Sequence, residues 1–538
     1  MRIFATKKSK MFLIAIFFLG LLIRLYNLKD NFFFSYDQAR DAQRVFEIIT
    51  NKDIKIVGPE TDIIGIHHGP LHYYLTLPFY FLSKFDPNIT VFLFVLLNMT
   101  VIIPLYLIAK LIFRKDFPAL LTSFLWSISF AQLNYARFIS NAAPMSLGAT
   151  IFFLGLIYYL FNKQKTKYLF ISVLGLVLSI NFNFMLVYLI IFYPLIYILF
   201  KLDKNKYLSD LKKSLFLFLI LTSNFIIAEI KWNFIGIKSL LNYLTSGSNH
   251  LNNQFYSFVI NYLGKLENAI VNSFFFINPK LALAFFLILL ILCYKSINDK
   301  NRYKLIILWL FSTFPLFMFK TGIVSFDFIN NPIYPVLTLT IAGGIYFIIQ
   351  INKLLGYALI IFILISNFIN IKNDEFKNIK VIEVQRITLK DEKDLIDYTY
   401  KEANNKEFSI CAVTNPLFIN TTWSFLYKFY GEKRYGYLPF WSGPDQHLNT
   451  SYLPYDTKRP ELKFLILEPE VGIPDYAIKA TLFLEDHRSK LIEEKKFGET
   501  IVQKRVLLPK PKELDLKKAD ELKLKDIISN DPRYSCYR

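Results

Sequence analysis

The sequence predicts an α-helical multi-pass membrane protein of about eleven spans, followed by a small mixed α/β domain on the outer side of the membrane. Three observations lead to this prediction. Hydrophobic residues make up 54% of the 538 residues and come in long blocks. Basic residues gather in short clusters between the blocks, and the composition becomes charged and mixed after Ile371. A purely soluble chain rarely combines these features.

The apolar blocks set the number of expected spans. A helix rises 1.5 Å per residue, so about 20 apolar residues cross roughly 30 Å of hydrocarbon. The first block lacks the small-residue cleavage site of a signal peptide, and we expect it to be retained as a span. The expected spans are 11–28, 88–109, 118–135, 144–162, 168–182, 184–200, 214–230, 279–295, 305–319, 334–350 and 353–370.

The basic clusters set the expected topology. The formal net charge is +20, and the Lys and Arg residues concentrate near 2–10, 110–115, 163–167, 201–213 and 295–304. Placing every cluster in the cytoplasm satisfies the positive-inside rule without exception. The N-terminus is then cytoplasmic, and an odd number of spans puts the C-terminus outside the cell membrane. The charge therefore indicates membrane topology and not a nucleic-acid partner.

Two domains follow from this topology. Residues 1–370 form the transmembrane domain, with long outer loops at 29–87 and 231–278. The short apolar segment 71–85 would invert the charge rule if it crossed the membrane, so we expect an interfacial helix on the outer side. Residues 371–538 form the outer domain, where alternating patterns predict strands at 408–413, 462–467 and 500–508 and a helix at 422–430. The three cysteines imply no disulfide framework.

Acidic residues follow the first span closely. Asp37 and Asp41 are four residues apart in DQARDAQRVFEII, a segment that can form a helix with both carboxylates on one face. Ser35 or Asp37 could instead simply cap that helix. An acid at the outer membrane surface can be partly desolvated and within reach of a lipid-borne substrate, which favours Asp37 as a catalytic group and Asp41 as a candidate second acid.

The segment GIHHGPLHYY, residues 65–74, lies later in the same outer loop. Its imidazoles, next to a rigid Gly-Pro turn, could bind a phosphate, although loop histidines are also common without a function. His68 is the candidate phosphate ligand, and His67, Pro70 and Tyr74 are expected to line the site. Adjacent histidines point apart and no third ligand has a convincing spacing, so no cofactor is firmly predicted, and a divalent metal ion is the less favoured alternative.

Further candidates on the outer side are Arg137, Asn141, Lys231 and Lys320. The three cations could hold an anionic group such as a lipid phosphate, and Asn141 could line the same site. Snorkelling of Arg137 and helix capping by Asn141 are the alternatives. No Gly-rich nucleotide-binding loop occurs.

The order of these motifs resembles the membrane-embedded glycosyltransferases of the GT-C superfamily. A span ends in IRLYNL, and YDQARDAQ, HGPLHYY and YARFISNAAP follow in turn. The similarity is to the branch that contains protein O-mannosyltransferases, aminoarabinose transferases of lipid A and related lipopolysaccharide-sugar transferases. It implies a sugar donor carried on a polyprenyl phosphate, an acceptor that is a glycan, lipid or protein, and transfer at the outer face with inversion.

The resemblance also implies roles for particular residues. The family's Asp-Glu pair, whose Asp is the proposed base, stands here as Asp37-Gln38. Its Lys-Pro-Pro-Leu segment, whose Lys contacts the donor phosphate, stands here as His68-Gly69-Pro70-Leu71. A later Gln-Phe-His-Tyr-like turn appears as NFNF at 181–184, without its His.

Two other classes of protein remain open on the sequence alone. A transporter or flippase for a lipid-linked or anionic substrate would place charges near the middle of the bilayer and use broken helices. Most of the expected spans lack central charges. A membrane scaffold or receptor with an outer domain is the third alternative.

Overall fold

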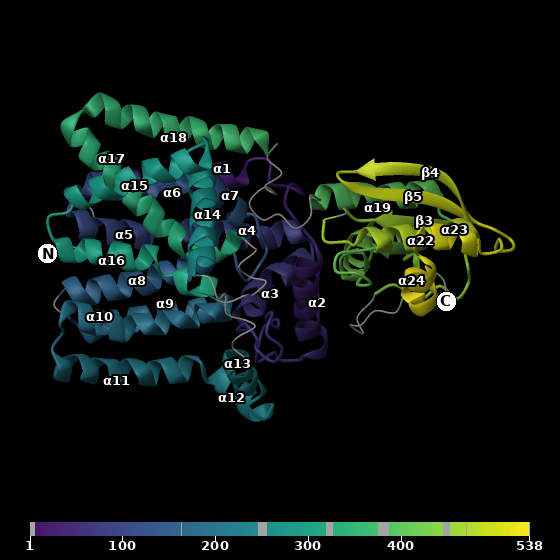
Figure 1. The fold of residues 1–538 in the computed structure, drawn as a ribbon, viewed down its shortest axis with the longest axis horizontal. Helices are drawn as coiled ribbons and strands as arrows, with labels where there is room; N and C mark the ends of the chain where they lie inside the picture. Colours follow the sequence, from purple (N-terminus) through teal and green to yellow (C-terminus); the bar gives the residue numbers. More distant parts are fainter. Residues whose placement is uncertain are drawn as a thin grey trace. The chain divides into compact units, whose positions relative to one another are not determined.

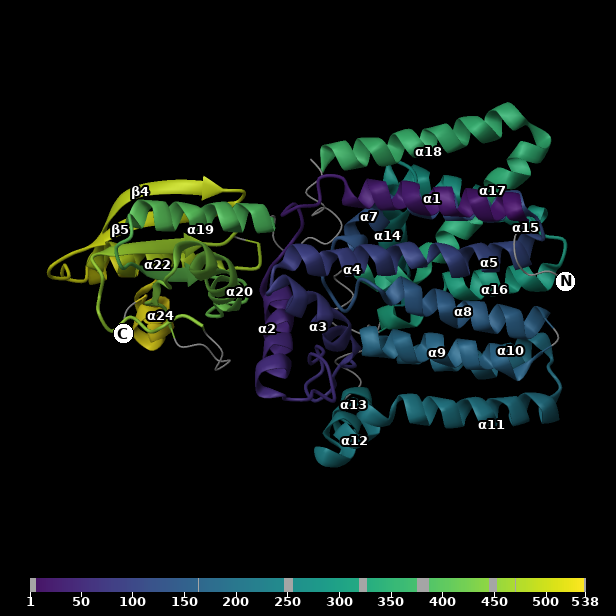
Figure 2. The same ribbon diagram turned by 180° about the vertical axis from the view of Figure 1, so that it is seen from behind.

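The computed structural model describes residues 6–162, 164–245, 255–318, 327–374, 387–444, 452–469 and 471–536. The chain forms two compact units (Figures 1 and 2). Unit 1 contains Met1–Leu28, Asp53–Leu77 and Thr90–Ile382, and unit 2 contains Lys29–Lys52, Pro78–Ile89 and Glu383–Arg538. The two parts of the first predicted outer loop that belong to unit 2 therefore cluster with the C-terminal residues.

Unit 1 is helical. Two helices, α3 (Leu71–Ser83) and α4 (Pro87–Thr100), have residues in both units, and α3 is the helix predicted at 71–85. The others are α1 (Lys7–Leu25), α5 (Ile102–Phe113), α6 (Asp116–Ile128), α7 (Phe130–Ala136), α8 (Met145–Phe161), α9 (Thr166–Phe182), η1 (Phe184–Ile191), α10 (Phe192–Phe200), α11 (Lys204–Leu221), α12 (Ser223–Lys231), α13 (Ile235–Thr245), α14 (Phe255–Ser273), α15 (Pro279–Ser296), α16 (Lys300–Leu310), η2 (Phe314–Met318), η4 (Asp327–Ile333), α17 (Tyr334–Ile351) and α18 (Lys353–Asn373).

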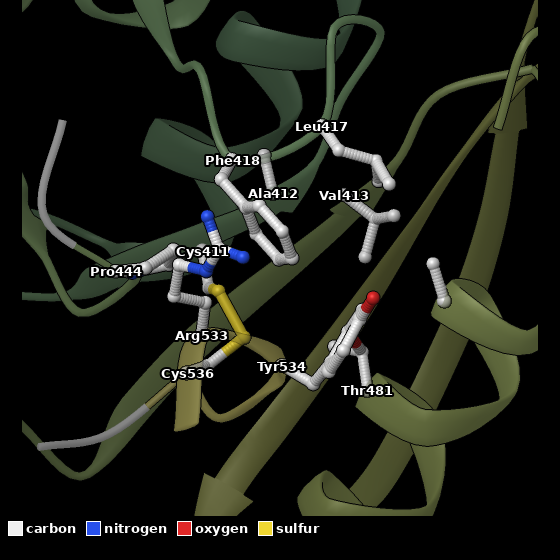
Figure 3. Close-up of a pocket in the computed structure, with 11 residues that line it drawn as sticks. Cys411, Ala412, Val413, Leu417, Phe418, Pro444, Thr481, Arg533, Tyr534 and Cys536 are labelled. Atoms are coloured by element: carbon white, nitrogen blue, oxygen red, sulfur yellow. A yellow bond between two sulfur atoms is a disulfide. The ribbon is translucent and has the colours of Figure 1, made fainter. Parts of the chain in front are cut away.

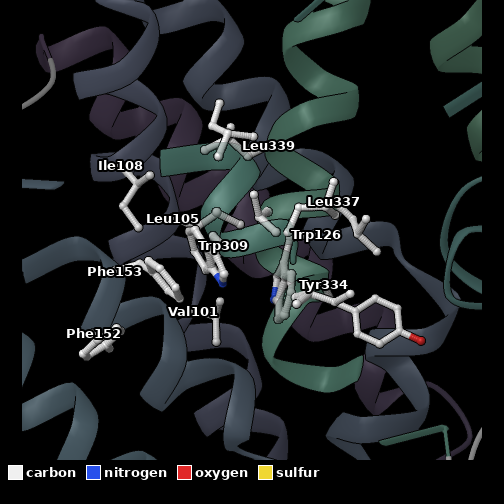
Figure 4. Packing of buried hydrophobic residues seen from close by; sticks show 14 of the residues in the cluster. Val101, Leu105, Ile108, Trp126, Phe152, Phe153, Trp309, Tyr334, Leu337 and Leu339 are labelled. Carbon is white, nitrogen blue, oxygen red and sulfur yellow. The ribbon is translucent and has the colours of Figure 1, made fainter. Parts of the chain in front are cut away.

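Small residues let α8 and α9 pack backbone against backbone. The two helices lie side by side in both ribbon views. A Cβ atom added to Gly155 would lie 2.2 Å from the Ser172 nitrogen, and one added to Gly175 would lie 2.1 Å from the Phe152 nitrogen. Close approach through glycine is a recurring way for helices to associate in lipid. Next to this pair, Phe153 stacks on Trp309 with ring centroids 4.4 Å apart (Figure 4).

The predicted span 118–135 breaks at Ser129, between α6 and α7. Buried polar side chains bind the backbone groups that the break releases. The guanidinium of Arg24, which is fully buried, donates to the carbonyls of Trp126 and Ser127 at 3.2 and 2.7 Å. The Asn367 Oδ1 atom accepts from the Phe130 nitrogen at 2.7 Å. Satisfying these groups inside the protein makes irregular backbone tolerable within a membrane.

The predicted number of spans is not confirmed. Within the described residues, four helices are long and apolar enough to cross a membrane: Pro87–Phe113, Pro279–Ser296, Asp327–Ile351 and Lys353–Asn373. Lys204–Leu221 and Ser223–Lys231 form a fifth candidate if they are one span bent by 57°. Three shorter apolar helices cover 145–161, 166–182 and 184–200. The count of eleven stays a prediction.

Unit 2 contains a five-stranded sheet in the order β2-β1-β3-β5-β4. Its strands are β1 (Ser409–Val413), β2 (Phe440–Trp441), β3 (Leu462–Leu467), β4 (Ser489–Phe497) and β5 (Thr500–Leu507). β1 pairs in parallel with β2 and β3, and β5 pairs antiparallel with β3 and β4. The three predicted strands are confirmed as β1, β3 and β5. The charged sequence of β4, which is exposed along most of its length, concealed the fourth strand from pattern analysis.

Two helices of unit 2, α19 and α22, pack on this sheet, and the unit also includes a helix from the first outer loop. The predicted helix 422–430 is confirmed as α20, which continues into the wider turn η5. The unit contains α2 (Tyr36–Asn51), α19 (Leu389–Ala403), α20 (Thr421–Leu426), η5 (Tyr427–Glu432), α21 (Lys433–Tyr435), α22 (Asp475–Arg488), α23 (Leu516–Glu521), α24 (Lys525–Asn530) and η6 (Pro532–Tyr534).

A disulfide corrects the expectation drawn from the cysteine count. Cys411, in the middle of β1, is bonded to Cys536 near the C-terminus, 125 residues later, while Cys293 is free and buried. A spacing of 125 residues carries no signal in a sequence, because only the fold brings the two thiols together. Figure 3 shows the bridge beside Phe418, Arg533 and Tyr534, which line a cavity of about 10 Å³. That volume holds about one water molecule.

The disulfide is expected to stabilise unit 2 substantially. A crosslink that closes a loop of about 100 residues is worth up to roughly 4.7 kcal/mol through restriction of the unfolded chain. We expect Cys411→Ser to lower the unfolding temperature of unit 2, measured on the purified full chain in detergent. Reductant should lower the unfolding temperature of the wild-type protein and leave that of Cys411→Ser unchanged. An equal response of the two proteins to reductant would contradict a disulfide at this position.

Two buried glutamates of unit 2 have opposite surroundings. Glu485 is 1% exposed and accepts two hydrogen bonds from the buried Lys463 ammonium, each 2.9 Å long. Glu392 is also 1% exposed, but its Oε2 atom has no hydrogen-bond partner within the described part of the chain. Burial, and then the negative charge of Glu468, raise the pKa of Glu392 well above its ordinary value.

The raised pKa of Glu392 determines how this residue changes the stability of the folded protein with pH. Since its pKa is higher in the folded state, the folded protein binds the proton more tightly, and stability falls as the pH rises above about 4.3, the unfolded value. Glu392→Gln removes this loss and should unfold at a higher temperature than the wild-type protein at pH 7, with a smaller difference at pH 4.5.

Glu485→Gln is the matched control, because it changes the same residue type at the same burial. It should lower stability by about 3–5 kcal/mol, since it leaves the Lys463 ammonium buried without its partner. Unfolding curves between pH 4.5 and 9 measure both effects. A Glu392→Gln variant less stable than wild-type at pH 7 would contradict a raised pKa of Glu392 in the folded protein.

Candidate functional site

The first candidate group lies on α2, in unit 2. The predicted acidic helix is confirmed and begins at Tyr36, with Ser35 as its N-cap; the Ser35 nitrogen donates to the Gln38 Oε1 atom at 3.0 Å. Asp37 is therefore in the first turn of the helix and is not its cap. Its side chain is 61% exposed and forms an ion pair with Arg40 at 2.7 Å. A carboxylate in the first turn also interacts favourably with the helix dipole.

Asp41 has the opposite environment. Its side chain is only 4% exposed and also pairs with Arg40, whose Nε and Nη2 atoms both lie 2.9 Å from the Asp41 Oδ1 atom. One guanidinium thus binds both carboxylates, which confirms that they share a helix face. Arg40 was missed in the sequence, although an Arg three residues after one Asp and next to another is a readable signal.

The second candidate group lies in unit 1, where residues 58–69 fold back on themselves as a short hairpin. The Gly58 nitrogen donates to the His68 carbonyl at 2.8 Å, and the His68 nitrogen donates to the Pro59 carbonyl at 2.9 Å. The end of this hairpin meets the turn between α9 and η1. There the Gly69 nitrogen donates to the Asn181 carbonyl at 3.1 Å. The structure therefore brings together the HGP and NFNF segments of the sequence.

A backbone contact fixes the protonation pattern of His68. The Phe184 nitrogen donates to the His68 Nδ1 atom at 3.0 Å, so Nδ1 must be the unprotonated nitrogen. The proton of the neutral ring is then on Nε2. His68 can offer this N–H to an anion as a neutral hydrogen-bond donor. A lysine at the same position would act as a flexible cation instead.

Gly69 is required for this contact. A Cβ atom at Gly69 would lie 2.1 Å from the Asn181 Oδ1 atom and 2.6 Å from its Cα atom. The second clash is with backbone, which cannot rotate away. Pro70 is buried, and its carbonyl accepts from the Tyr73 nitrogen at 3.0 Å in the first turn of α3. The Gly-Pro pair therefore holds His68 at the start of that helix.

The remaining candidates of the HGP segment face other parts of the loops. His67 packs on Trp232, with ring centroids 5.3 Å apart. The exposed Lys231, at the end of α12, is the neighbour of that tryptophan in the chain. The Tyr74 hydroxyl donates to the Lys55 carbonyl at 2.8 Å. Tyr74 thus braces the loop, while Lys231 presents a cation to solvent.

Arg137 is buried and binds backbone carbonyls. It is 1% exposed, its Nε atom donates to the Arg24 carbonyl at 2.9 Å, and its Nη2 atom donates to the carbonyl of Tyr26. These carbonyls are at the C-terminal end of α1, where a cation is favourable. Asn141 is half-buried, and its Oδ1 atom accepts from the Ser140 hydroxyl at 3.3 Å. Lys320 lies outside the described residues.

The described residues contain no group of three or more His, Cys, Asp or Glu side chains arranged to hold a metal ion. The structure does not bring Arg137 to the His68 hairpin: its donors are used at the end of α1.

Comparison with known proteins gives a match in fold. No protein-family model matches the sequence, and a search among curated proteins found none. Among solved structures, one similar chain is the archaeal oligosaccharyltransferase AglB from Archaeoglobus fulgidus in complex with an inhibitory peptide and a dolichol-phosphate. The TM-score is 0.51 at 12% identity, over 92% of this chain and 74% of that one. The chain therefore shares the overall fold of this oligosaccharyltransferase.

A second structure of the Archaeoglobus fulgidus oligosaccharyltransferase, in complex with Zn and sulfate, gives a TM-score of 0.50. The identity is 12%, and the match covers 90% of this chain and 72% of that one. The likeness in fold covers most of this chain, and it agrees with the expectation of a mostly helical protein that carries a small sheet domain.

The Gly69 contact can be tested through stability. Gly69→Ala must displace either the His68 hairpin or the α9–η1 turn, and overpacking of this kind typically costs about 1–3 kcal/mol. Gly264→Ala, within α14 of the same unit, is the matched control, because a Cβ atom there meets nothing within 4 Å. Thermal unfolding of the purified full chain in detergent should show a loss for Gly69→Ala and none for Gly264→Ala. Equal unfolding temperatures would contradict the close approach.

Proposed function

We propose that this protein is an integral-membrane glycosyltransferase that moves a sugar from a polyprenyl-phosphate donor to a hydroxyl group of a glycan, lipid or protein acceptor at the outer face of the membrane. The observation that carries the proposal is an exposed carboxylate, Asp37, oriented by Arg40 in the first outer loop of a GT-C fold. AglB, which shares that fold, has been solved with a dolichol-phosphate.

Asp37 would act as the general base. It would accept the proton of the acceptor hydroxyl as that oxygen attacks the anomeric carbon, a role that contributes typically about 10²- to 10⁴-fold to the rate. The side chain is 61% exposed, so a substrate can reach it. Attack in a single step, from the side opposite the departing phosphate, inverts the anomeric configuration.

His68 would stabilise the leaving group. The polyprenyl phosphate gains negative charge as the glycosidic bond breaks, and a pre-oriented donor is worth most where charge develops. The Phe184 nitrogen donates to Nδ1, so the proton of the neutral His68 ring is on Nε2, and this N–H group would donate to a phosphate oxygen. Lys231 is exposed and could add a cation to the same anion.

An outer location for the C-terminal part has support from its chemistry. Disulfides persist mainly in oxidising compartments outside the cytoplasm, and Cys411 and Cys536 are joined by one. The positive-inside rule puts the same residues outside.

A transporter or flippase is the second candidate, because α6 and α7 form a broken helix of the kind that transporters use. In transporters the freed ends of such helices bind the cargo. Here Arg24 binds the freed carbonyls of α6 and Asn367 binds an amide of α7. This arrangement uses the break for packing, and the observation favours the transferase.

The base is tested with Asp37→Asn. Membranes that contain the variant would be given radiolabelled polyprenyl-phosphate-linked hexoses and pentoses together with a native acceptor extract. We expect transfer to fall by 10²-fold or more, because the amide cannot accept the proton. Expression and the unfolding temperature should stay at wild-type values, since Asp37 is exposed.

Asp62→Asn provides the control, since it removes another exposed carboxylate of the same outer loop. Its transfer should equal that of the wild-type protein. Undiminished transfer by Asp37→Asn would remove Asp37 from the mechanism.

A further inference from the structure

The helix that carries Asp37 is packed into the C-terminal part of the chain. Phe46, five residues after Asp41 on α2, lies among three aromatic rings, with ring centroids 5.3 Å from Phe85, 5.5 Å from Phe429 and 5.6 Å from Tyr452. All three contacts are steep, edge-to-face arrangements, each worth about 0.5–1.5 kcal/mol beyond the area buried. We call this set of four rings the Phe46 cluster.

The segment before α2 is hydrogen-bonded to the start of α19. The Leu389 nitrogen donates to the Phe32 carbonyl at 3.0 Å, and the Lys390 nitrogen donates to the Asp30 carbonyl at 2.9 Å. These bonds join the first-loop backbone to the start of α19, which would otherwise have unpaired amides in its first turn. The ring of Phe34 lies 5.6 Å from that of Phe425 on α20.

A partly buried ion pair reinforces the same contact. The Lys393 ammonium lies 2.5 Å from the Asp30 Oδ1 atom, and the two side chains are 12% and 19% exposed. The Asn88 Nδ2 atom also donates to that carboxylate, at 2.8 Å. Low exposure and a second donor make this pair stronger than the usual surface salt bridge.

Side-chain contacts connect Asp41 to Asp37 through Arg40. Asp41 is buried within unit 2, and its carboxylate holds the Arg40 guanidinium through two N–H groups. The remaining Arg40 Nη1 atom donates to Asp37 at 2.7 Å. A buried anchor therefore sets the direction of an exposed carboxylate.

We propose that the C-terminal α/β part of the chain is the positioning scaffold of Asp37: the Phe46 cluster and the Asp30–Lys393 pair fix α2, and Asp41 and Arg40 fix the carboxylate. This inference rests on the proposed function and deepens it. Asp41 is then a positioning residue, not a second catalytic acid. Since a misplacement of about 1 Å can cost about 10²-fold in rate, loosening α2 should lower the rate of the chemical step.

The first experiment compares two aromatic truncations in the full-length protein. Phe46→Ala opens the Phe46 cluster. Phe408→Ala removes a ring that is 0% exposed and packs on Phe464, Tyr400 and Tyr437 of the same unit, none of which lies on α2. Truncation of a fully buried Phe typically costs about 3–5 kcal/mol of stability. Phe46 is half-buried and should lose less, so Phe408→Ala is the more disruptive of the two.

Transfer is measured with the same radiolabelled polyprenyl-phosphate sugars, at a temperature where both variants are folded. We expect Phe46→Ala to lower the maximal rate at least tenfold without a matching change in the donor concentration for half-maximal rate. Phe408→Ala should keep the wild-type rate, and Phe46→Leu, which restores most of the lost volume, should recover most of it. Equal rates for Phe46→Ala and Phe408→Ala would overturn the inference.

A second comparison covers the case in which Phe46→Ala does not fold. Arg40→Met leaves the Asp41 carboxylate buried without its cation and should lower both stability and rate. The double variant Arg40→Met/Asp41→Asn removes the buried charge as well and leaves only the exposed Asp37 without its cation, so stability should return while the rate stays at least tenfold low. Recovery of both properties would show a purely structural role and overturn the inference.

The result for Asp37→Asn separates the two proposals. If Asp37→Asn abolishes transfer while Phe46→Ala and the double variant retain the wild-type maximal rate, the scaffold inference is overturned and the proposed function stands. If Asp37→Asn transfers normally, the proposed base and the scaffold inference both fail.

Discussion

The position of the acid helix depends on one packing interaction, the contact of Phe46 with the rings of Phe85, Phe429 and Tyr452. These four aromatic residues come from three distant parts of the sequence. Their contact makes a helix from the first loop part of the same compact unit as the C-terminal sheet. A loop helix on its own would be marginal in water at 16 residues. Packing of its apolar face supplies the stability that its length does not.

The transmembrane unit solves a different problem, that of unpaired backbone in a region without water. Glycines allow α8 and α9 to approach closely, and Arg24 and Asn367 bind the groups released where α6 ends and α7 begins. The bonds from Arg24 and Asn367 pair backbone groups that water cannot reach within a membrane. The His68 hairpin also depends on a glycine, because Gly69 lies so close to Asn181 that a Cβ atom would not fit between them.

Much of this architecture could be predicted from patterns that are local in the sequence. The acidic helix, the helix after the Gly-Pro turn and the strands β1, β3 and β5 all follow from periodicity and turn residues. The exposed strand β4 could not, because its charged face hides the alternation. The pairing of Cys411 with Cys536 and the packing of Phe46 could not either, since each joins residues far apart in the sequence.

Some features of the candidate site could likewise be predicted from the sequence, and others could not. Asp37 and His68 were predicted as site residues from motif order, and the structure adds their surroundings on α2 and at the α9–η1 turn. Arg137 was predicted from a common pattern, a cation near the outer end of a span, while its burial against the carbonyls of α1 is visible only in the fold. Arg40 was missed because its role comes from binding two carboxylates at once, those of Asp37 and Asp41.

The central claim is that a sugar is transferred in one step from a lipid phosphate to a hydroxyl group activated by Asp37. The anomeric configuration of the product tests this most directly. Wild-type membranes would be given a β-configured polyprenyl-phosphate hexose labelled with ¹³C at the anomeric carbon, and the product would be analysed by NMR. An α-linked product is expected from a single displacement. A β-linked product would contradict it, and so would the absence of any labelled product across the hexose and pentose donors.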